Sequence, residues 1–279
     1  MAKHSSSWMK TCNLPDSGEA APVVGFALRV TVALFFAALV AGFGQFGAVS
    51  SLNDVAQHFG HHGSGTSLKS VVGLSGSVLG LGLAILRLAS LASLPLSSLA
   101  DRRGRTRVLQ SLLLLGLVAT SAASLSFSYW FFVISFAFAR PLLSAASTIV
   151  QVITVELSSM QQRMHRLVVM AAGAGIGAGL SAVLHGVIRG PNSFRWLFAV
   201  AVIPALVIVP IVRTIPEPRY HNADVPFAHL GAVPRGVRGR LMIVSTAAFA
   251  IGMITGPANG FAFVYGEGVL KISPPRREG

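Results

Sequence analysis

Long apolar runs constrain this chain more than any other feature of its sequence. A helix that crosses the hydrocarbon core of a bilayer needs about 20 mostly apolar residues, and seven runs reach about that length. They cover residues 24–50, 70–99, 107–126, 130–155, 167–188, 195–213 and 241–264. The sequence therefore predicts an all-α membrane protein with several spans.

The composition favours a lipid environment over water. Hydrophobic residues make up 53% of the 279 positions and charged residues only 11%, whereas a soluble domain carries about 25% charged residues. A formal net charge of +13 can indicate a nucleic-acid binder. Here the basic residues stand at the ends of apolar runs and form no stripe on a polar domain. We expect the lipid bilayer as a partner, and no nucleic acid.

The distribution of Lys and Arg predicts the orientation, because cytoplasmic loops carry an excess of both residues. With the N-terminus in the cytoplasm, thirteen of them fall in inside segments and three in outside turns. The polar leader of the first run is too long for a signal peptide, so we expect an uncleaved span. The chain is therefore predicted to be a multi-pass protein of the cell membrane, plasma or inner, with a cytoplasmic N-terminus.

One long break interrupts the apolar runs after the sixth. It reads TIPEPRYHNADVPFAHLGAVPRGVRGR and is rich in Pro, Gly and Arg, as expected of a linker. We predict a cytoplasmic tail, a six-helix transmembrane bundle, a cytoplasmic linker and the first span of a second bundle. Their bounds are 1–23, 24–213, 214–240 and 241–279.

The turn between the second and third runs concentrates charge in an otherwise apolar chain. It reads LADRRGRTRVL from Leu99 to Leu109, with one aspartate and four arginines around one glycine. A basic loop alone would anchor the topology. Asp101 ends an apolar helix among arginines, which predicts an ion pair. Gly104 predicts a tight turn with a positive φ.

This turn resembles the loop motif of the major facilitator superfamily, G-x-L-A-D-R-x-G-R-R/K-x-x-L. The matching residues are Leu99, Ala100, Asp101, Arg102, Gly104, Arg105 and Leu109. The chain departs from the motif at Ser97, where the family usually has glycine, and at Thr106, where it usually has a basic residue. The resemblance covers roughly residues 24–265.

Further motifs extend the resemblance. Arg140 matches the arginine of a second family motif, although the usual Gln-Gly that follows is replaced by Leu-Ser. Glu156 and Arg163 resemble the E-x6-R pattern of sugar-porter-like members. The segment IPEPRY, which holds Glu217 and Arg219, is similar to the PESPR motif of the same branch.

The resemblance implies a fold and a transport mechanism. The family fold has two six-helix bundles, each of two inverted three-helix repeats, with a solute site near the midplane. The inner charged loops would lock one state, and Asp101 would approach the N-terminus of a second-bundle helix, a contact worth about 0.3–1 kcal/mol. By this resemblance we assign gating to Asp101, Arg102, Gly104, Arg105, Glu156, Arg163, Glu217 and Arg219.

Polar residues inside the runs are candidates for lining the cavity. A central arginine costs at least about 2.5–3.5 kcal/mol on insertion scales, so Arg140 should face a cavity or a partner. Gln45 is a second candidate. Asn259 is a third, because the nearby Gly256-Pro257 suggests a broken helix. For Arg87, a transport role and a structural pairing stay equally open.

The fifth run contains two overlapping GxxxG spacings, Gly173/Gly177 and Gly175/Gly179. Small residues at this spacing are typical of close packing between membrane helices. The run lacks the Gly-Pro and Gly-Gly elements that mark drug–proton antiporters at this position.

The expected function is transport of an unknown small solute by alternating access. Two alternatives stay open: a non-transporting membrane remnant or regulatory half-bundle, and a drug–proton antiporter. A coupling proton also stays open, because none of the nine acidic residues falls clearly at membrane depth. We find no nucleophile–base pair, phosphate loop or metal set, and expect no enzyme activity, cofactor or metal. With one span of the second bundle present, we expect the chain to be truncated.

Overall fold

The structure is a computed structural model, and every regular element it describes is helical, as predicted. The described residues are 28–60, 74–188, 193–217 and 235–268. The helices are α1 (Leu28–Ser50), α2 (Leu52–Phe59), α4 (Gly76–Ala89), α5 (Ser93–Arg103), α6 (Arg105–Ala122), α7 (Tyr129–Glu156), α8 (Arg163–Val187), α9 (Ser193–Ala199), α10 (Val202–Val212) and α11 (Arg235–Gly268), with short 3-10 turns η1 (Ser90–Ala92) and η2 (Ala123–Leu125). The predicted tail 1–23 and Arg219 lie outside the described residues.

Six helical stretches are long and apolar enough to cross a membrane. They are Leu28–Ser50, Ser77–Arg103, Arg105–Leu125, Tyr129–Glu156, Arg163–Val187 and Phe194–Val212. Each overlaps one of the first six predicted runs. At most ends, the observed and predicted bounds agree to within a few residues. The second span starts later than predicted and continues to Arg103, because the helix extends through the first arginines of the charged turn.

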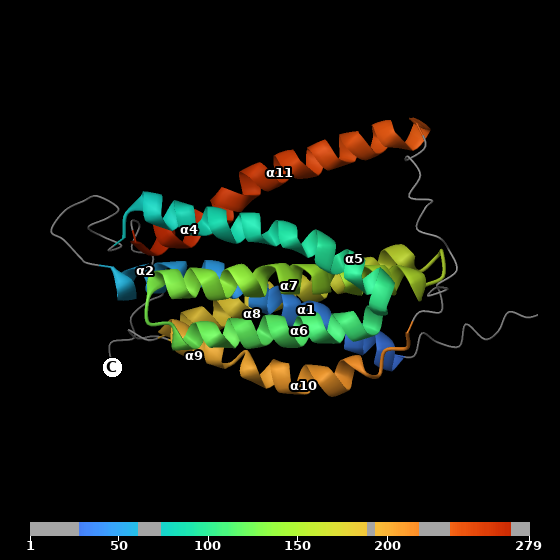
Figure 1. Ribbon diagram of the computed structural model, residues 1–279, viewed down its shortest axis with the longest axis horizontal. Helices are drawn as coiled ribbons and strands as arrows, with labels where there is room; N and C mark the ends of the chain where they lie inside the picture. Colours follow the sequence, from blue (N-terminus) through green and yellow to red (C-terminus); the bar gives the residue numbers. More distant parts are fainter. Residues whose placement is uncertain (1–27, 61–73, 189–192, 218–234, 269–279) are drawn as a thin grey trace, which may run out of the picture.

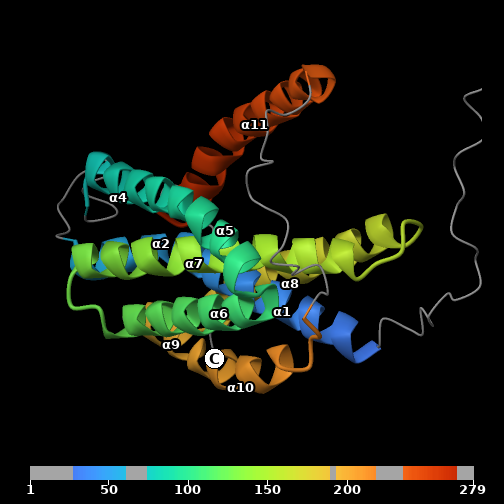
Figure 2. The same ribbon diagram turned by 45° about the vertical axis from the view of Figure 1, so that its right-hand side comes forward.

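The seventh predicted run lies within α11, which is not among these six stretches. Its described side chains from Arg238 to Thr255 are all exposed. Figures 1 and 2 show α11 standing away from the other helices over much of its length. Among the described residues, its main contacts are with α1 and α2.

The break expected at Gly256-Pro257 is wrong, because α11 is one continuous helix through both residues. A proline in a helix removes one backbone hydrogen bond. Long helices of membrane proteins tolerate this loss through small local adjustments.

Helix α1 lies at the centre of the bundle (Figure 2), and 67% of its most apolar window is buried. Helix α8 packs closely against it. A Cβ added at Gly42 would meet the carbonyl oxygen of Ala174, and one added at Gly177 would meet that of Leu39. The two backbones therefore touch, which confirms the close packing predicted from Gly173 and Gly177.

The second GxxxG spacing behaves differently. A Cβ added at Gly175 or Gly179 would have no neighbour within 4 Å. This side of α8 is exposed in the structure. Helix α8 therefore presents two small-residue faces, of which one is packed and the other open.

Two apolar cores follow each other along the bundle. The core nearer the α5–α6 turn includes the fully buried Leu34, Leu109, Leu113, Leu143, Ile153 and Ile208. The core at the other end is aromatic. Phe132, Phe136 and Phe198 form a triangle with ring centroids 4.9 to 5.7 Å apart, which fixes α9 against α7. Together these cores hold the spans in register around α1.

The second span is interrupted between α4 and α5. Pro95 has no N–H to donate to the carbonyl of Leu91, and the 3-10 turn η1 occupies this place. The hydroxyl of Ser90 donates back to the carbonyl of Leu86 at 3.0 Å. Ser90 therefore stands at an irregular point of a membrane helix, where backbone geometry differs from the ideal.

Candidate functional site

Charged residues from several segments gather where α5 meets α6. The turn between these helices lies beside the C-terminal ends of α7 and α10, on the right-hand side of Figure 1. We call this region, made of residues 101–107, 156–166 and 213–217, the basic end. It contains most of the residues for which the sequence predicted gating.

Gly104 forms the turn with a φ of +95°, which confirms the predicted positive φ. It is both the C-cap of α5 and the N-cap of α6. A side chain here would be strained by the backbone conformation. Its Cβ would also lie 3.1 Å from Oε1 of Glu217. Both the positive φ and the closeness of Glu217 therefore require glycine at this position.

The carboxylate of Glu217 caps the N-terminus of α6. It accepts hydrogen bonds from the backbone N–H of Arg105 and, at 3.2 Å, from that of Thr106. The first N–H groups of a helix lack partners within it and carry a partial positive charge. The cap therefore joins the segment after α10 to the start of α6, and a cap of this kind is worth about 1 kcal/mol.

The side chain of Arg105 joins two further helices. Its Nη2 and Nε donate to Oδ1 of Asp101 at 2.9 and 3.1 Å, which confirms the predicted ion pair of Asp101. Its Nη1 forms an ion pair with Oε1 of Glu156 at the end of α7. Among the described residues, the hydrogen bonds and the ion pair of Asp101 are with Arg105, and none is with a helix beyond the linker.

The remaining predicted gating residues lie outside this network or beyond the described residues. Arg163 donates from Nε to the carbonyl of Ser158 at 3.3 Å and so closes the turn between α7 and α8. Arg102 is exposed at the end of α5. Arg219 has no described position. Five of the eight predicted residues thus come together: Asp101, Gly104, Arg105, Glu156 and Glu217.

A second polar cluster lies in the middle of the bundle. Arg140 of α7 donates from Nε to the hydroxyl of Ser90 at 3.1 Å and from Nη1 to the carbonyl of Gln45 at 3.5 Å. The amide of Gln45 donates to the carbonyl of Leu143 at 3.2 Å. Arg140 therefore has partners inside the protein, as expected, and the cluster joins α1, the α4–α5 break and α7.

Two residues near Arg140 were not among the predicted sites. The sequence did not single out Ser90. Its position three residues after Arg87, and so on the same face of a helix, is the feature that could have identified it. Arg87 itself lies close enough for its charge to repel that of Arg140. Asn259, the third predicted cavity residue, lies on α11, and its side chain is outside the described residues.

A polar contact that the sequence did not predict lies at the opposite end of the bundle, and it is an ion pair when His185 is protonated. Nδ1 of His185 on α8 is 3.4 Å from Oδ2 of Asp54 on α2. His185 is buried and Asp54 half-buried. Over the described residues, no group of three or more His, Cys, Asp or Glu side chains is placed to hold a metal ion.

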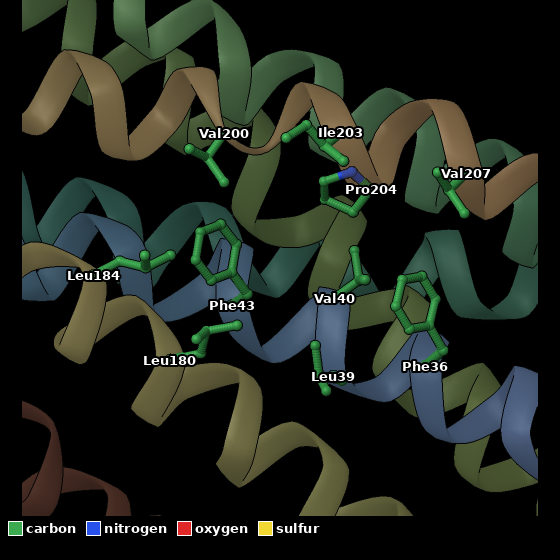
Figure 3. A pocket seen from close by; sticks show the side chains of 10 residues that line it. All are labelled: Phe36, Leu39, Val40, Phe43, Leu180, Leu184, Val200, Ile203, Pro204 and Val207. Carbon is green, nitrogen blue, oxygen red and sulfur yellow. The ribbon is translucent and has the colours of Figure 1, made fainter.

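The apolar pocket shown in Figure 3 is a poor site for a polar solute. It lies between α1, α8 and the junction of α9 with α10, and has a volume of about 220 Å³. It is lined by Phe36, Leu39, Val40, Phe43, Leu180, Leu184, Val200, Ile203, Pro204 and Val207. No polar side chain is among these lining residues, so the pocket offers a solute no side-chain hydrogen bond.

Six apolar helices long enough to span a bilayer, with an arginine held inside the bundle, define a multi-pass membrane protein. The sequence profile of the Major Facilitator Superfamily matches residues 34–275. The chain belongs to this superfamily, whose members are membrane transporters and not enzymes. No sequence among the curated proteins matches it.

Solved structures share the fold. The xylose transporter XylE from E. coli, in a partially occluded inward-open conformation, superposes with a TM-score of 0.56 at 17% identity, over 68% of this chain and 48% of XylE. The inward-open conformation of XylE gives a TM-score of 0.54 over the same shares. A crystal structure of a D-xylose–proton symporter gives 0.55 at 18% identity, over 89% of this chain and 56% of the symporter. The chain thus spans about half the length of these transporters.

Proposed function

We propose that the protein acts in the transport of a small solute across the membrane by alternating access. The observation that carries this proposal is the network around Arg105. One arginine ties α5 and α7 to α6 through its side chain, while its backbone N–H binds Glu217 of the segment after α10. Half-exposed ion pairs are worth about 1 kcal/mol or less each, so such a network can open and close within a cycle.

The division of the chain predicted above belongs to this proposal. Residues 1–23 form a tail, 24–213 a bundle of two inverted three-helix repeats, 214–240 a linker and 241–279 the start of a second bundle. The exposed side chains of α11 support the last assignment, because a long apolar helix with exposed sides requires lipid or further helices around it. The excess of Lys and Arg supports a cytoplasmic position of the basic end and of the N-terminus in a cell-membrane protein.

The predicted residues take two roles. Asp101, Gly104, Arg105, Glu156 and Glu217, together with Arg102, Arg163 and Arg219, form a latch that closes the cytoplasmic side. Arg140, Gln45 and Asn259 line the solute path. The likeness to sugar transporters supports the fold of this path, whereas the choice of solute depends on the residues that line it.

Efflux from proteoliposomes tests the proposal. Vesicles loaded with a mixed panel of sugars, carboxylates and sugar phosphates should lose at least one solute faster than protein-free vesicles, as read by mass spectrometry. Asp101→Asn should slow that efflux without reducing membrane insertion. Arg107→Gln removes a charge from the same turn outside the network and should leave the rate unchanged. Equal efflux with and without protein would favour a non-transporting half-bundle.

A further inference from the structure

The apolar pocket of Figure 3 opens on the outside of the bundle. Its inner wall is α1, from which the rings of Phe36 and Phe43 point toward the facing helix (Figure 3). Its rim consists of Leu180 on α8 and of Ile203 and Val207 on α10, which are 42, 62 and 43% exposed. These helices belong to membrane-spanning stretches, where no water is present. The rim therefore borders the hydrocarbon of the bilayer.

The backbones of both walls set the width of this pocket. On one side, α1 and α8 already touch, because Gly177 lies against the carbonyl of Leu39. On the other side, Pro204 has no N–H to donate to the carbonyl of Val200. That carbonyl accepts the N–H of Ile203 instead, at 3.1 Å, where the sixth span is interrupted between α9 and α10. The pocket thus lies between a close helix contact and an irregular turn with a proline, a feature that bends helices.

The depth of the pocket follows from its position along the sixth span. Trp196, which is exposed, precedes Val200 by four residues and Val207 by eleven, so all three lie near one face of the helix. At 1.5 Å per residue, the pocket begins about 6 Å and ends about 17 Å beyond Trp196. Exposed tryptophans at the ends of spans mark the level of the headgroups. The pocket therefore lies in the hydrocarbon of one leaflet, the leaflet opposite the basic end.

The lining and the size of the pocket fit a hydrocarbon chain. All of its lining side chains are hydrocarbon, and its volume is about 220 Å³. An apolar cavity of about 150 Å³ is enough to hold a benzene molecule. Lining atoms that face an empty space lose their contacts on that side. A flexible chain from the bilayer restores these contacts and brings no polar group into the pocket.

The surface around the pocket favours lipid as the occupant. Ile176, Leu180, Val183 and Val187 are exposed and follow one another at helical spacing along α8. The rim of the pocket is thus part of an apolar stripe that faces outward along most of this helix. Helix α11, the start of the proposed second bundle, lies across the bundle from α10 in both views (Figures 1 and 2). The second bundle therefore approaches a different side.

We propose that this pocket binds one acyl chain of a membrane phospholipid from the leaflet opposite the basic end. The chain lies along α10 and fills the space between α1, α8 and the α9–α10 junction. The headgroup stays outside, at the level of Trp196. This inference goes beyond the proposed transport function and does not depend on it.

Native mass spectrometry of the full chain, released from detergent micelles, tests the inference. The probe is dioleoyl phosphatidylcholine, added in increasing amounts. Dibutyryl phosphatidylcholine is the counterpart, because it has the same headgroup on chains too short to reach the pocket from the level of Trp196. The long-chain lipid should bind in a saturable way with one molecule per protein, and the short-chain lipid should not. Equal binding of both lipids, or no saturable binding, would overturn the inference.

Variants locate the site. Val207→Phe places a ring in the pocket and should weaken binding of the long-chain lipid at least about fivefold, because the filled space excludes the chain. Leu206→Phe is the matched control, since Leu206 is 74% exposed and does not line the pocket. It should bind lipid as wild type. Leu180→Trp fills the pocket from α8 and keeps the test valid if Val207→Phe fails to fold. Unchanged binding in the filled variants, or equal weakening in the control, would overturn the site.

The same spectra test a second copy of the chain as the occupant. They report the number of protein chains in each particle as well as the number of lipids. A monomer that retains the lipid supports the inference. A dimer that forms without lipid and is lost in Val207→Phe, but not in Leu206→Phe, would assign this face to a second copy and overturn the lipid site.

Discussion

The carboxylate of Glu217 caps the helix that begins at Arg105, although 112 positions separate the two residues. The segment after the sixth span is therefore bonded to the start of the third, at the same turn where Arg105 holds α5 and α7. Four segments meet at one arginine and one glycine. A substitution at Arg105 or Gly104 therefore alters contacts of most of the basic end.

Removing the cap should destabilise the bundle measurably. Glu217→Ala leaves the N–H groups of Arg105 and Thr106 without the carboxylate and should lower the free energy of unfolding by about 0.5–2 kcal/mol. Unfolding in mixed micelles on SDS titration provides the measurement. Glu217→Gln keeps an acceptor oxygen and should lose less. An alanine variant as stable as wild type would show that the cap contributes nothing.

Replacing the turn glycine should cost more than replacing a glycine within a helix. Gly104→Ala forces a side chain into a positive φ and against Glu217, and should destabilise by about 1 kcal/mol or more. Gly80→Ala is the control, because an added Cβ there has no neighbour within 4 Å and favours the helix. The two unfolding free energies should therefore shift in opposite directions. Equal shifts would contradict the role of the turn.

The two faces of α8 should respond differently to added volume. Gly177→Ala places a methyl group against the backbone of Leu39 and should separate α8 from α1, with a loss of about 1–3 kcal/mol. Gly179→Ala on the open face should be neutral or slightly stabilising in the isolated chain. The same SDS titration compares them. Similar losses for both variants would mean that the second face is also covered.

The pair at the other end of the bundle should show energetic coupling. In a double-mutant cycle with Asp54→Asn and His185→Gln, the two substitutions together should cost less than the sum of each alone, by about 0.5–1 kcal/mol. The buried position of His185 is the reason for expecting a measurable value. Strict additivity would show that the short distance carries no energy.

Much of the fold follows directly from hydropathy. Runs of about 20 apolar residues must form helices in a bilayer, because no water is present to satisfy an open backbone. Six of the seven predicted runs coincide with helices that are long and apolar enough to cross a membrane. Gly104 was predictable for a local reason, since the turn between two antiparallel helices is short. The break at Pro257 failed as a prediction because a single proline does not decide the course of a long helix.

The contacts between distant segments were harder to predict. Arg105 pairs with Glu156 and Glu217 because packing brings separate spans together. The spacing of these residues along the chain does not indicate that they are in contact. The pair of Asp54 with His185 was missed for the same reason. Arg140 was found because charge at membrane depth is costly, whereas Ser90, a neutral residue among many serines, carried no such signal.

The close contact of Gly42 with Ala174 has a consequence for how the protein is made. Helix α1 leaves the ribosome before α8, yet α8 provides the backbone that covers it. Its final packing cannot form until four more spans have been synthesised. During that interval the first helix depends on lipid or on the insertion machinery to shield a surface that the finished protein keeps for itself.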